Sequence, residues 1–182
     1  MSIVFEEEAR GQSVMETAMR MMTAARTAPK ARGIDNLVIA VIGKEEIAKL
    51  SAETERLAKE ENAPEFFLRD AENILNADAL VLVGTKIAAC GVPFCGLCGF
   101  GDCAGKGKHP EVPCAFNTGD LGIAIGSAVS IAADDRVDSR VMFSVGAAAV
   151  RLGWLPGAKI VYGIPLAAKK KNPFFDRVWP KK

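Results

Sequence analysis

Hydrophobic residues follow two patterns along the chain. In some segments they recur with the period of a helix, and in others they form the short continuous runs that are typical of buried strands. Near the N-terminus the helical period predicts a helix over about residues 7–28, which ends at Pro29 because proline cannot continue a helix. The apolar face of this helix is predicted to consist of Met15, Ala18, Met19, Met22 and Ala25. Core packing explains such a methionine-rich face better than contact with a flat cofactor does.

Three runs rich in Val, Ile and Leu predict buried strands at residues 36–43, 77–84 and 158–167. Two amphipathic helices are predicted between the first two strands. One covers about residues 44–61 and the other begins at Pro64.

Two further helices are predicted before the last strand. The stretch "GDLGIAIGSAVSIAA" predicts a helix over about residues 120–133, capped by Thr118 or Asp120. Because this helix is apolar on all sides, we expect it to be buried in the middle of the molecule or of a dimer. Residues 139–154 predict another helix, with Gly153 as its C-terminal stop.

The bulk composition indicates one globular domain over residues 1–182. Hydrophobic residues make up 49% and charged residues 25% of the chain. The net charge of +1 produces no field that would attract nucleic acid or a membrane surface. The N-terminus carries no apolar signal segment, and the longest apolar stretch is too short to span a bilayer. We therefore expect a cytoplasmic protein without nucleic-acid or membrane partners.

All the cysteines of the chain lie in one glycine-rich loop, residues 90–114, which we expect to be inserted after the second strand. They are Cys90, Cys95, Cys98, Cys103 and Cys114. Cytoplasmic thiols stay reduced, so this clustering indicates metal or redox chemistry rather than structural disulfides. The loop leaves the C-terminal end of a strand, where the sheets of α/β proteins usually place ligand sites.

The composition of this loop favours an iron–sulfur cluster. Cys95 and Cys98 are two residues apart, and Gly96 and Gly99 allow the tight turn that brings two thiolates to one centre. The side chains expected to shield the cluster from water are Phe94, Leu97 and Phe100. A zinc site and an unmetallated thiol–disulfide loop are the alternatives, and the other, looser spacings are unusual for zinc. The single histidine, His109, is interpreted as a solvated loop residue.

A cubane cluster needs four thiolates, so one of the cysteines is spare. We expect this residue to be Cys90, because Pro93 and the four-residue gap place it where the loop begins. An alternative ligand set consists of Cys90, Cys95, Cys98 and Cys103, which follows the spacing of plant-type ferredoxins.

The segment "CGLCGFGDC" resembles the Cys-Gly-x-Cys-Gly-x-x-x-Cys core of a 4Fe-4S motif. That motif occurs in the iron–sulfur subunit of the Rnf electron-transport complex and in the corrinoid iron–sulfur protein. The resemblance implies Cys95, Cys98, Cys103 and Cys114 as ligands, although the last gap is shorter here. The whole chain resembles a prokaryotic family of ferredoxin-domain proteins through "ARTAPKARGIDNLVIAVI", "LVLVGTK", the cysteine loop and "NTGDLGIAIGSAVSIAADDRVDSR".

Three segments, "TAARTAPKARGIDNLVIAVI", "GDLGIAIGSAVSIAA" and "KIVYGIPLA", are similar to parts of the nitroreductase superfamily. This resemblance implies an α+β nitroreductase-like fold, with helices around a small central sheet. It also implies a homodimer with flavin mononucleotide at its interface. The chain lacks the N-terminal Arg-Arg-Ser-x-Arg that holds the flavin phosphate in that superfamily. Arg26, Lys30 and Arg32 form a basic turn that would replace it, the alternative being a solvated turn.

These observations leave three functional hypotheses. The first is a 4Fe-4S protein for electron transfer or redox sensing, which meets a redox partner protein. The second is a flavin-dependent oxidoreductase of nitroreductase type with an auxiliary cluster. The third is a zinc-stapled interaction module without catalysis. The sequence contains no Ser-His-Asp set and no convincing carboxylate pair, so we assign no catalytic residue.

Overall fold

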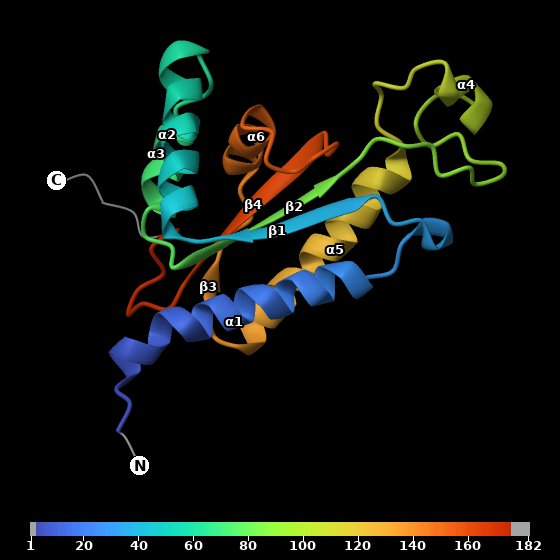
Figure 1. Ribbon diagram of the computed structural model, residues 1–182. Helices are drawn as coiled ribbons and strands as arrows, with labels where there is room; N and C mark the ends of the chain where they lie inside the picture. The colour runs from blue at the N-terminus through green and yellow to red at the C-terminus, as the bar shows by residue number, and fades with distance from the viewer. Residues whose placement is uncertain (1–2, 176–182) are drawn as a thin grey trace, which may run out of the picture.

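A four-stranded antiparallel sheet with helices on both faces forms the protein, in a computed structural model that describes residues 3–175 (Figure 1). The strands are β1 (Leu37–Ile42), β2 (Ala79–Thr85), β3 (Asp138–Ser139) and β4 (Ile160–Ala167), in the order β1-β2-β4-β3. The helices are α1 (Glu6–Thr27), the 3-10 turn η1 (Ala31–Gly33), α2 (Lys44–Glu60), α3 (Phe66–Ile74), α4 (Cys103–Gly107), α5 (Ala115–Asp134) and α6 (Phe143–Arg151). This arrangement confirms the predicted combination of helices around a small sheet.

The strand β2 is buried along its whole length, because it pairs with β1 and β4 and is covered on both faces. Its odd-numbered residues, such as Val81 and Val83, pack against α1 and α5. Its even-numbered residues Leu80 and Leu82 pack against the layer of α2, α3 and α6. A strand covered on both faces needs apolar residues at every position, which explains its unbroken hydrophobic run.

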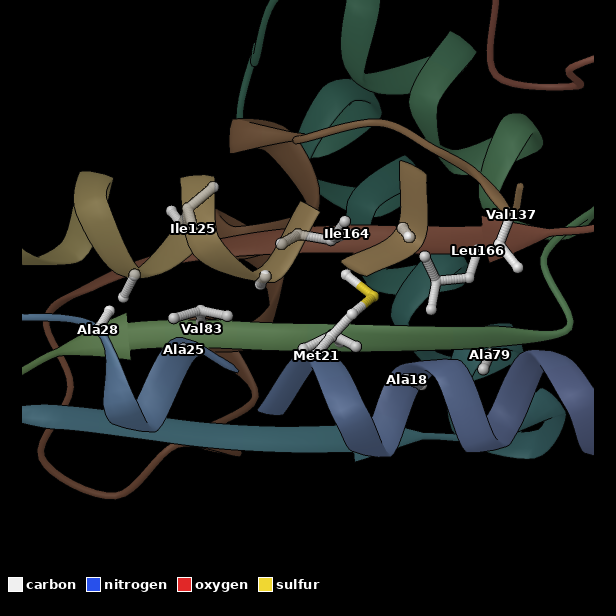
Figure 2. Packing of buried hydrophobic residues seen from close by; sticks show 14 of the residues in the cluster. Ala18, Met21, Ala25, Ala28, Ala79, Val83, Ile125, Val137, Ile164 and Leu166 are labelled. Atoms are coloured by element: carbon white, nitrogen blue, oxygen red, sulfur yellow. The ribbon is translucent and has the colours of Figure 1, made fainter. Parts of the chain in front are cut away.

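The helices α1 and α5 pack side by side against one face of the sheet (Figures 1 and 2). Small side chains dominate this contact, among them Ala18 and Ala25 of α1 and Ala128 of α5, each fully buried. Small residues allow the two helices to lie close to the strands and to each other. Figure 2 shows the side chain of Met21 extending from α1 toward α5, where it fills the remaining space.

The buried face of α1 differs from the predicted one. It consists of Val14, Thr17, Ala18, Met21 and Ala25. Met19 is 46% exposed, and Met15 and Met22 are only partly buried. The prediction missed that Thr17 belongs to the core face, because its hydroxyl donates a 2.8 Å hydrogen bond to the Asp135 carboxylate and is thereby satisfied.

The helix α5 begins at Ala115, earlier than predicted, and Cys114 is its N-cap residue. Thr118 and Asp120 therefore lie inside the helix and do not cap it. One side of α5 packs on the sheet, but Ile123 on the other side is 49% exposed. Burial of the whole helix within one molecule is thus wrong, and its burial in a dimer stays a prediction.

The helix predicted over residues 139–154 is shorter in the structure. Ser139 belongs to β3 and Met142 forms a bridge to Gly163 of β4, so α6 begins only at Phe143. Pairing with the sheet edge satisfies the backbone of this segment in place of a helical turn. Within residues 3–175, none of the helices combines the length and hydrophobicity that a membrane span requires.

Gly146 allows α6 to lie directly on the backbone of β4. A Cβ atom at this position would stand 1.8 Å from the carbonyl oxygen of Val161. We expect Gly146→Ala to lower the free energy of unfolding by about 3 kcal/mol, because overpacking would force the helix away from the strand. A Cβ atom at Gly11 in α1 would meet nothing within 4 Å beyond the backbone of its own helix, so Gly11→Ala is expected to raise the free energy of unfolding by about 1 kcal/mol. Urea denaturation measures both changes, and a neutral effect at Gly146 would contradict the tight contact.

Candidate metal centre

The cysteine loop, residues 90–114, lies at the end of the sheet where β2 ends and α5 begins (Figure 1). Its only helix or strand is the short helix α4. All five cysteines are free thiols, with Cys90 and Cys114 buried and the other three partly exposed. The thiols therefore occupy one corner of the molecule, just beyond the N-terminal end of a long helix.

Two buried polar residues of α5 tie the surroundings of the loop together. The Asn117 side chain accepts a 2.9 Å hydrogen bond from the backbone N–H of Ala88, just before the loop. The Asp120 carboxylate accepts a 3.1 Å hydrogen bond from the N–H of Ala31 in η1. These contacts explain why two polar side chains interrupt the apolar sequence of α5. The role of Asn117 was not predicted and Asp120 was expected to cap the helix, although a polar residue in an apolar helix was the available signal.

Arg32 holds the first residues of the loop against η1. Its guanidinium donates hydrogen bonds to the carbonyl oxygens of Cys90 and Gly91, at 3.1 Å and 2.9 Å. A Cβ atom at Gly91 would lie 2.7 Å from the same guanidinium, and Gly91 has a φ of +72°. Glycine is therefore required at this turn by both its conformation and its contact.

The Cys90 thiol is turned into the protein. It donates a 3.6 Å hydrogen bond to the carbonyl oxygen of Ala31. Burial raises the pKa of this thiol, and the neighbouring Cys114 and Asp120 act in the same direction. At neutral pH the Cys90 side chain is consequently a protonated donor.

Cys114 stands at the N-terminus of a 20-residue helix. Its carbonyl oxygen accepts a hydrogen bond from the N–H of Asn117, at 2.9 Å, which begins the helix. The N-terminal end of a helix carries partial positive charge from its unpaired N–H groups. A negatively charged sulfur ligand is favoured electrostatically at this position.

The middle of the loop is shaped by turns and by α4. The N–H of Gly99 bonds the carbonyl of Gly96 at 2.9 Å, which closes a turn around Cys98. The Asp102 carboxylate caps α4 by accepting a 2.7 Å hydrogen bond from the N–H of Gly105. Glycine chains bend sharply enough to wrap a bulky inorganic group.

The three apolar residues that were expected to shield the cluster, Phe94, Leu97 and Phe100, do not form a shield. Phe94 is fully exposed and Leu97 is 73% exposed. Only Phe100 has a partner, the His109 ring, on which it stacks with 4.9 Å between ring centroids. His109 also lies 3.6 Å from the Glu111 carboxylate and remains exposed, in agreement with its interpretation as a solvated loop residue.

The donor chemistry of the loop fits an iron–sulfur cluster. Five thiols without a disulfide among them, surrounded by glycine, supply the soft ligands that such a cluster requires. Across residues 3–175, however, no three side chains of Cys, His, Asp or Glu are gathered as one set of metal ligands. The ligand roles of Cys95, Cys98, Cys103 and Cys114 therefore stay a prediction, as does the spare role of Cys90.

The three residues of the basic turn lie in one region, and each makes contacts within the protein. Arg26 forms an ion pair with Asp35 at 2.6 Å. Lys30 donates hydrogen bonds to the carbonyl oxygens of Arg26 and Ala28, at 2.6 Å and 2.7 Å, which terminates α1. Arg32 holds the cysteine loop. All three cations thus stabilise the turn, and a role in binding a flavin phosphate remains a prediction.

A groove of about 440 Å³ separates this turn from α5. It is lined by Lys30, Ala31, Leu97, Phe116, Asp120 and Ile123, among others. Its walls are mainly apolar, and the cysteine loop contributes Leu97 to its rim. The groove therefore connects the surroundings of the loop with the exposed side of α5.

The fold resembles that of solved nitroreductases and of a BluB-like flavoprotein. A nitroreductase with bound FMN from Desulfitobacterium hafniense matches with a TM-score of 0.57 and 14% identity, over 86% of this chain and 78% of that one. A putative NADH dehydrogenase/NAD(P)H nitroreductase from Bacteroides thetaiotaomicron matches with a TM-score of 0.56 and 12% identity, over 91% of this chain and 80% of that one. A BluB-like flavoprotein from Clostridium difficile matches with a TM-score of 0.52 and 20% identity, over 92% of this chain and 84% of that one. The fold is accordingly nitroreductase-like, as predicted.

Two sequence comparisons identify the family. An uncharacterized protein of Archaeoglobus fulgidus is 39% identical over 184 residues, which cover 97% of this chain and 98% of the relative. Residues 111–177 match the family model described as "Uncharacterized protein containing a ferredoxin domain" (DUF2148). The matched segment begins just before Cys114 and includes α5, α6 and β4. The chain therefore belongs to the DUF2148 family of ferredoxin-domain proteins, on a nitroreductase-like fold.

Proposed function

We propose that this protein is an iron–sulfur redox protein, which binds one 4Fe-4S cluster and transfers or senses single electrons. The observation that carries the proposal is the placement of all five thiols, unpaired, in one glycine-rich loop at the end of the sheet. The ferredoxin-domain family and the nitroreductase-like fold support a redox role. The cytoplasm, where thiols stay reduced, is the compartment that suits this chemistry.

The proposed ligands are Cys95, Cys98, Cys103 and Cys114. When bound, the cluster supplies a centre that accepts and releases one electron. Cys114 places its sulfur at the positive end of α5, which offsets part of the negative charge of the thiolates.

Cys90 is the proposed spare thiol. A metal ligand must be a thiolate, whereas burial favours the protonated form of Cys90 and its proton is donated to Ala31. The alternative set, in which Cys90 replaces Cys114, would require this hydrogen bond to be broken.

A second candidate is a flavin-dependent oxidoreductase with an auxiliary cluster. It is favoured by structural neighbours that contain FMN and by the apolar groove beside Lys30. The same fold supports a homodimer, in which the exposed side of α5 would be covered by a second subunit. A zinc-stapled module has no observation of its own in its favour, and metal analysis separates it from the other two.

Iron and sulfide analysis of protein prepared without oxygen tests the main proposal. We expect about four iron and four sulfide per chain in the native protein and less than a tenth of that in Cys98→Ala, because three thiolates hold a cubane poorly. About one zinc per chain without sulfide would instead identify the stapled module. Release of a yellow fluorescent compound on denaturation would favour the flavin enzyme.

Two matched variants test the ligand set. Cys90→Ala should keep the iron content of the native protein, since its thiol is engaged with Ala31. Cys114→Ala should lose most of it, since this change removes a proposed ligand. The reverse result, iron lost at Cys90 and kept at Cys114, would establish the alternative set.

Replacement of an exposed residue on α5 tests the dimer. Ile123→Glu would place a charge in the proposed interface and should convert a dimer into a monomer, as sedimentation velocity would measure. Val150→Glu, at a similarly exposed position of α6, serves as the control and should leave the dimer intact. A native protein that sediments as a monomer would remove the dimer from the proposal.

A further inference from the structure

A cavity of about 690 Å³ lies between the ends of two strands and the last part of the cysteine loop. Its lining residues fall in three segments, 86–87 after β2, 110–113 of the loop, and 157–160 where β4 begins. Cavities of about 300–1,000 Å³ are the size that small molecules occupy in proteins. The cavity shares no lining residue with the groove beside Lys30 and is therefore a separate place on the molecule.

Two lysines of the wall are fixed at neighbouring points of the backbone. Lys86 directly follows β2 and Lys159 directly precedes β4. Thr85 and Ile160 pair in the sheet, so both lysines follow this pair at the same end of the two strands. The Lys86 N–H donates a 2.9 Å hydrogen bond to the Asn36 carbonyl, and the Lys159 N–H donates one of 2.9 Å to the Thr85 carbonyl. Two ammonium groups thus extend from rigid, adjacent positions.

The positive charge of these two side chains is not neutralised by the protein. Within residues 3–175, neither Lys86 nor Lys159 has an ion pair or a side-chain hydrogen bond. Of the residues that line the cavity, Glu111 is the one carboxylate, and it lies 3.6 Å from His109 instead. Like charges at neighbouring positions of two paired strands repel each other. A negative charge placed between the two lysines would replace this repulsion by attraction.

The other walls of the cavity suit an apolar group. Exposed lysines are often merely solvated, so the lysines alone would not define a binding site. Beside them, two isoleucines and two conformationally restricted prolines form a continuous part of the lining, namely Ile87, Pro110, Pro113 and Ile160. Gly157 turns the chain with a φ of +77°, and a Cβ atom there would lie 3.4 Å from Cε of Lys86. The stem of Lys86 therefore lies against this turn, which restricts the positions of its ammonium group.

We propose that this cavity binds an organic phosphate. The phosphate would lie between the ammonium groups of Lys86 and Lys159, and its apolar body would contact the prolines and isoleucines. A phosphate monoester carries a charge between about −1.5 and −2 at neutral pH, which two lysines balance. Lysine binds phosphate as a point charge, and burial of the apolar body removes its surface from water. This site does not depend on the proposed cluster, because none of its lining residues is a cysteine.

Isothermal titration calorimetry with naphthyl phosphate tests the site. Naphthylmethanol has the same rings without the charge and should bind about tenfold more weakly, because it forms neither ion pair. Lys86→Met and Lys159→Met should each raise the Kd for naphthyl phosphate about fivefold, as expected for the loss of one partly solvated ion pair. Both lysines are exposed, so these variants are expected to fold.

Two further variants separate the site from a general effect of charge. Lys49→Met removes the same charge from an exposed position of α2 outside the cavity and should leave the Kd unchanged. Lys159→Arg keeps the charge and should bind within about twofold of the native protein.

Several results would overturn the proposal. One is equal affinity of the native protein for naphthyl phosphate and naphthylmethanol, which would reduce the cavity to an apolar patch. Another is equally tight binding of inorganic phosphate, since the apolar walls would then contribute nothing. A loss of affinity in Lys49→Met as large as in Lys159→Met would indicate non-specific attraction. Iron and sulfide contents enter none of these measurements, so the outcome is independent of the iron–sulfur proposal.

Discussion

The burial of β2 on both faces is the constraint on which the rest of the structure depends. None of its residues from Ala79 to Gly84 carries a polar side chain, because one side is covered by α1 and α5 and the other by α2, α3 and α6. The strand ends at Thr85, and the chain leaves the core at that point. The start of the cysteine loop is therefore fixed by the packing of the sheet rather than by the loop's own sequence.

Two buried polar residues of α5 connect the packed core to the beginning of the cysteine loop. Asn117 is 1% exposed and satisfied by the backbone of Ala88, and Asp120 is satisfied by the backbone of Ala31. A buried polar group without its partner costs about 1–3 kcal/mol, so each of these bonds penalises any displacement of the backbone that it holds. Together with Arg32, they make the beginning of the loop part of the rigid fold.

Hydrophobic patterns were sufficient to predict most of the fold. The runs of Val, Ile and Leu located β1, β2 and β4 because buried strands tolerate few polar residues. The patterns failed where a polar side chain finds its partner far away in the sequence. Thr17 belongs to the core of α1 only because Asp135 accepts its hydrogen bond, and periodicity contains no information about that contact. The start of α5 was predicted too late for the same reason. Asn117 is a residue typical of loops, and its distant partner Ala88 cannot be inferred from periodicity.

The candidate site was predictable in its composition and not in its geometry. Cysteine and glycine content identified the loop, since these residue types have few other reasons to concentrate in one segment. Side-chain directions within the loop follow from local turns, and so the exposure of Phe94 and the burial of Lys106 were both unexpected. The hydrogen bond between Ala88 and Asn117 closes a segment of 29 residues. Chain closure over this length costs about 3 kcal/mol of conformational entropy, which is offset by this bond and by the packing of α5 on the sheet. Binding of the proposed cluster would then only have to order the interior of a loop whose ends already meet.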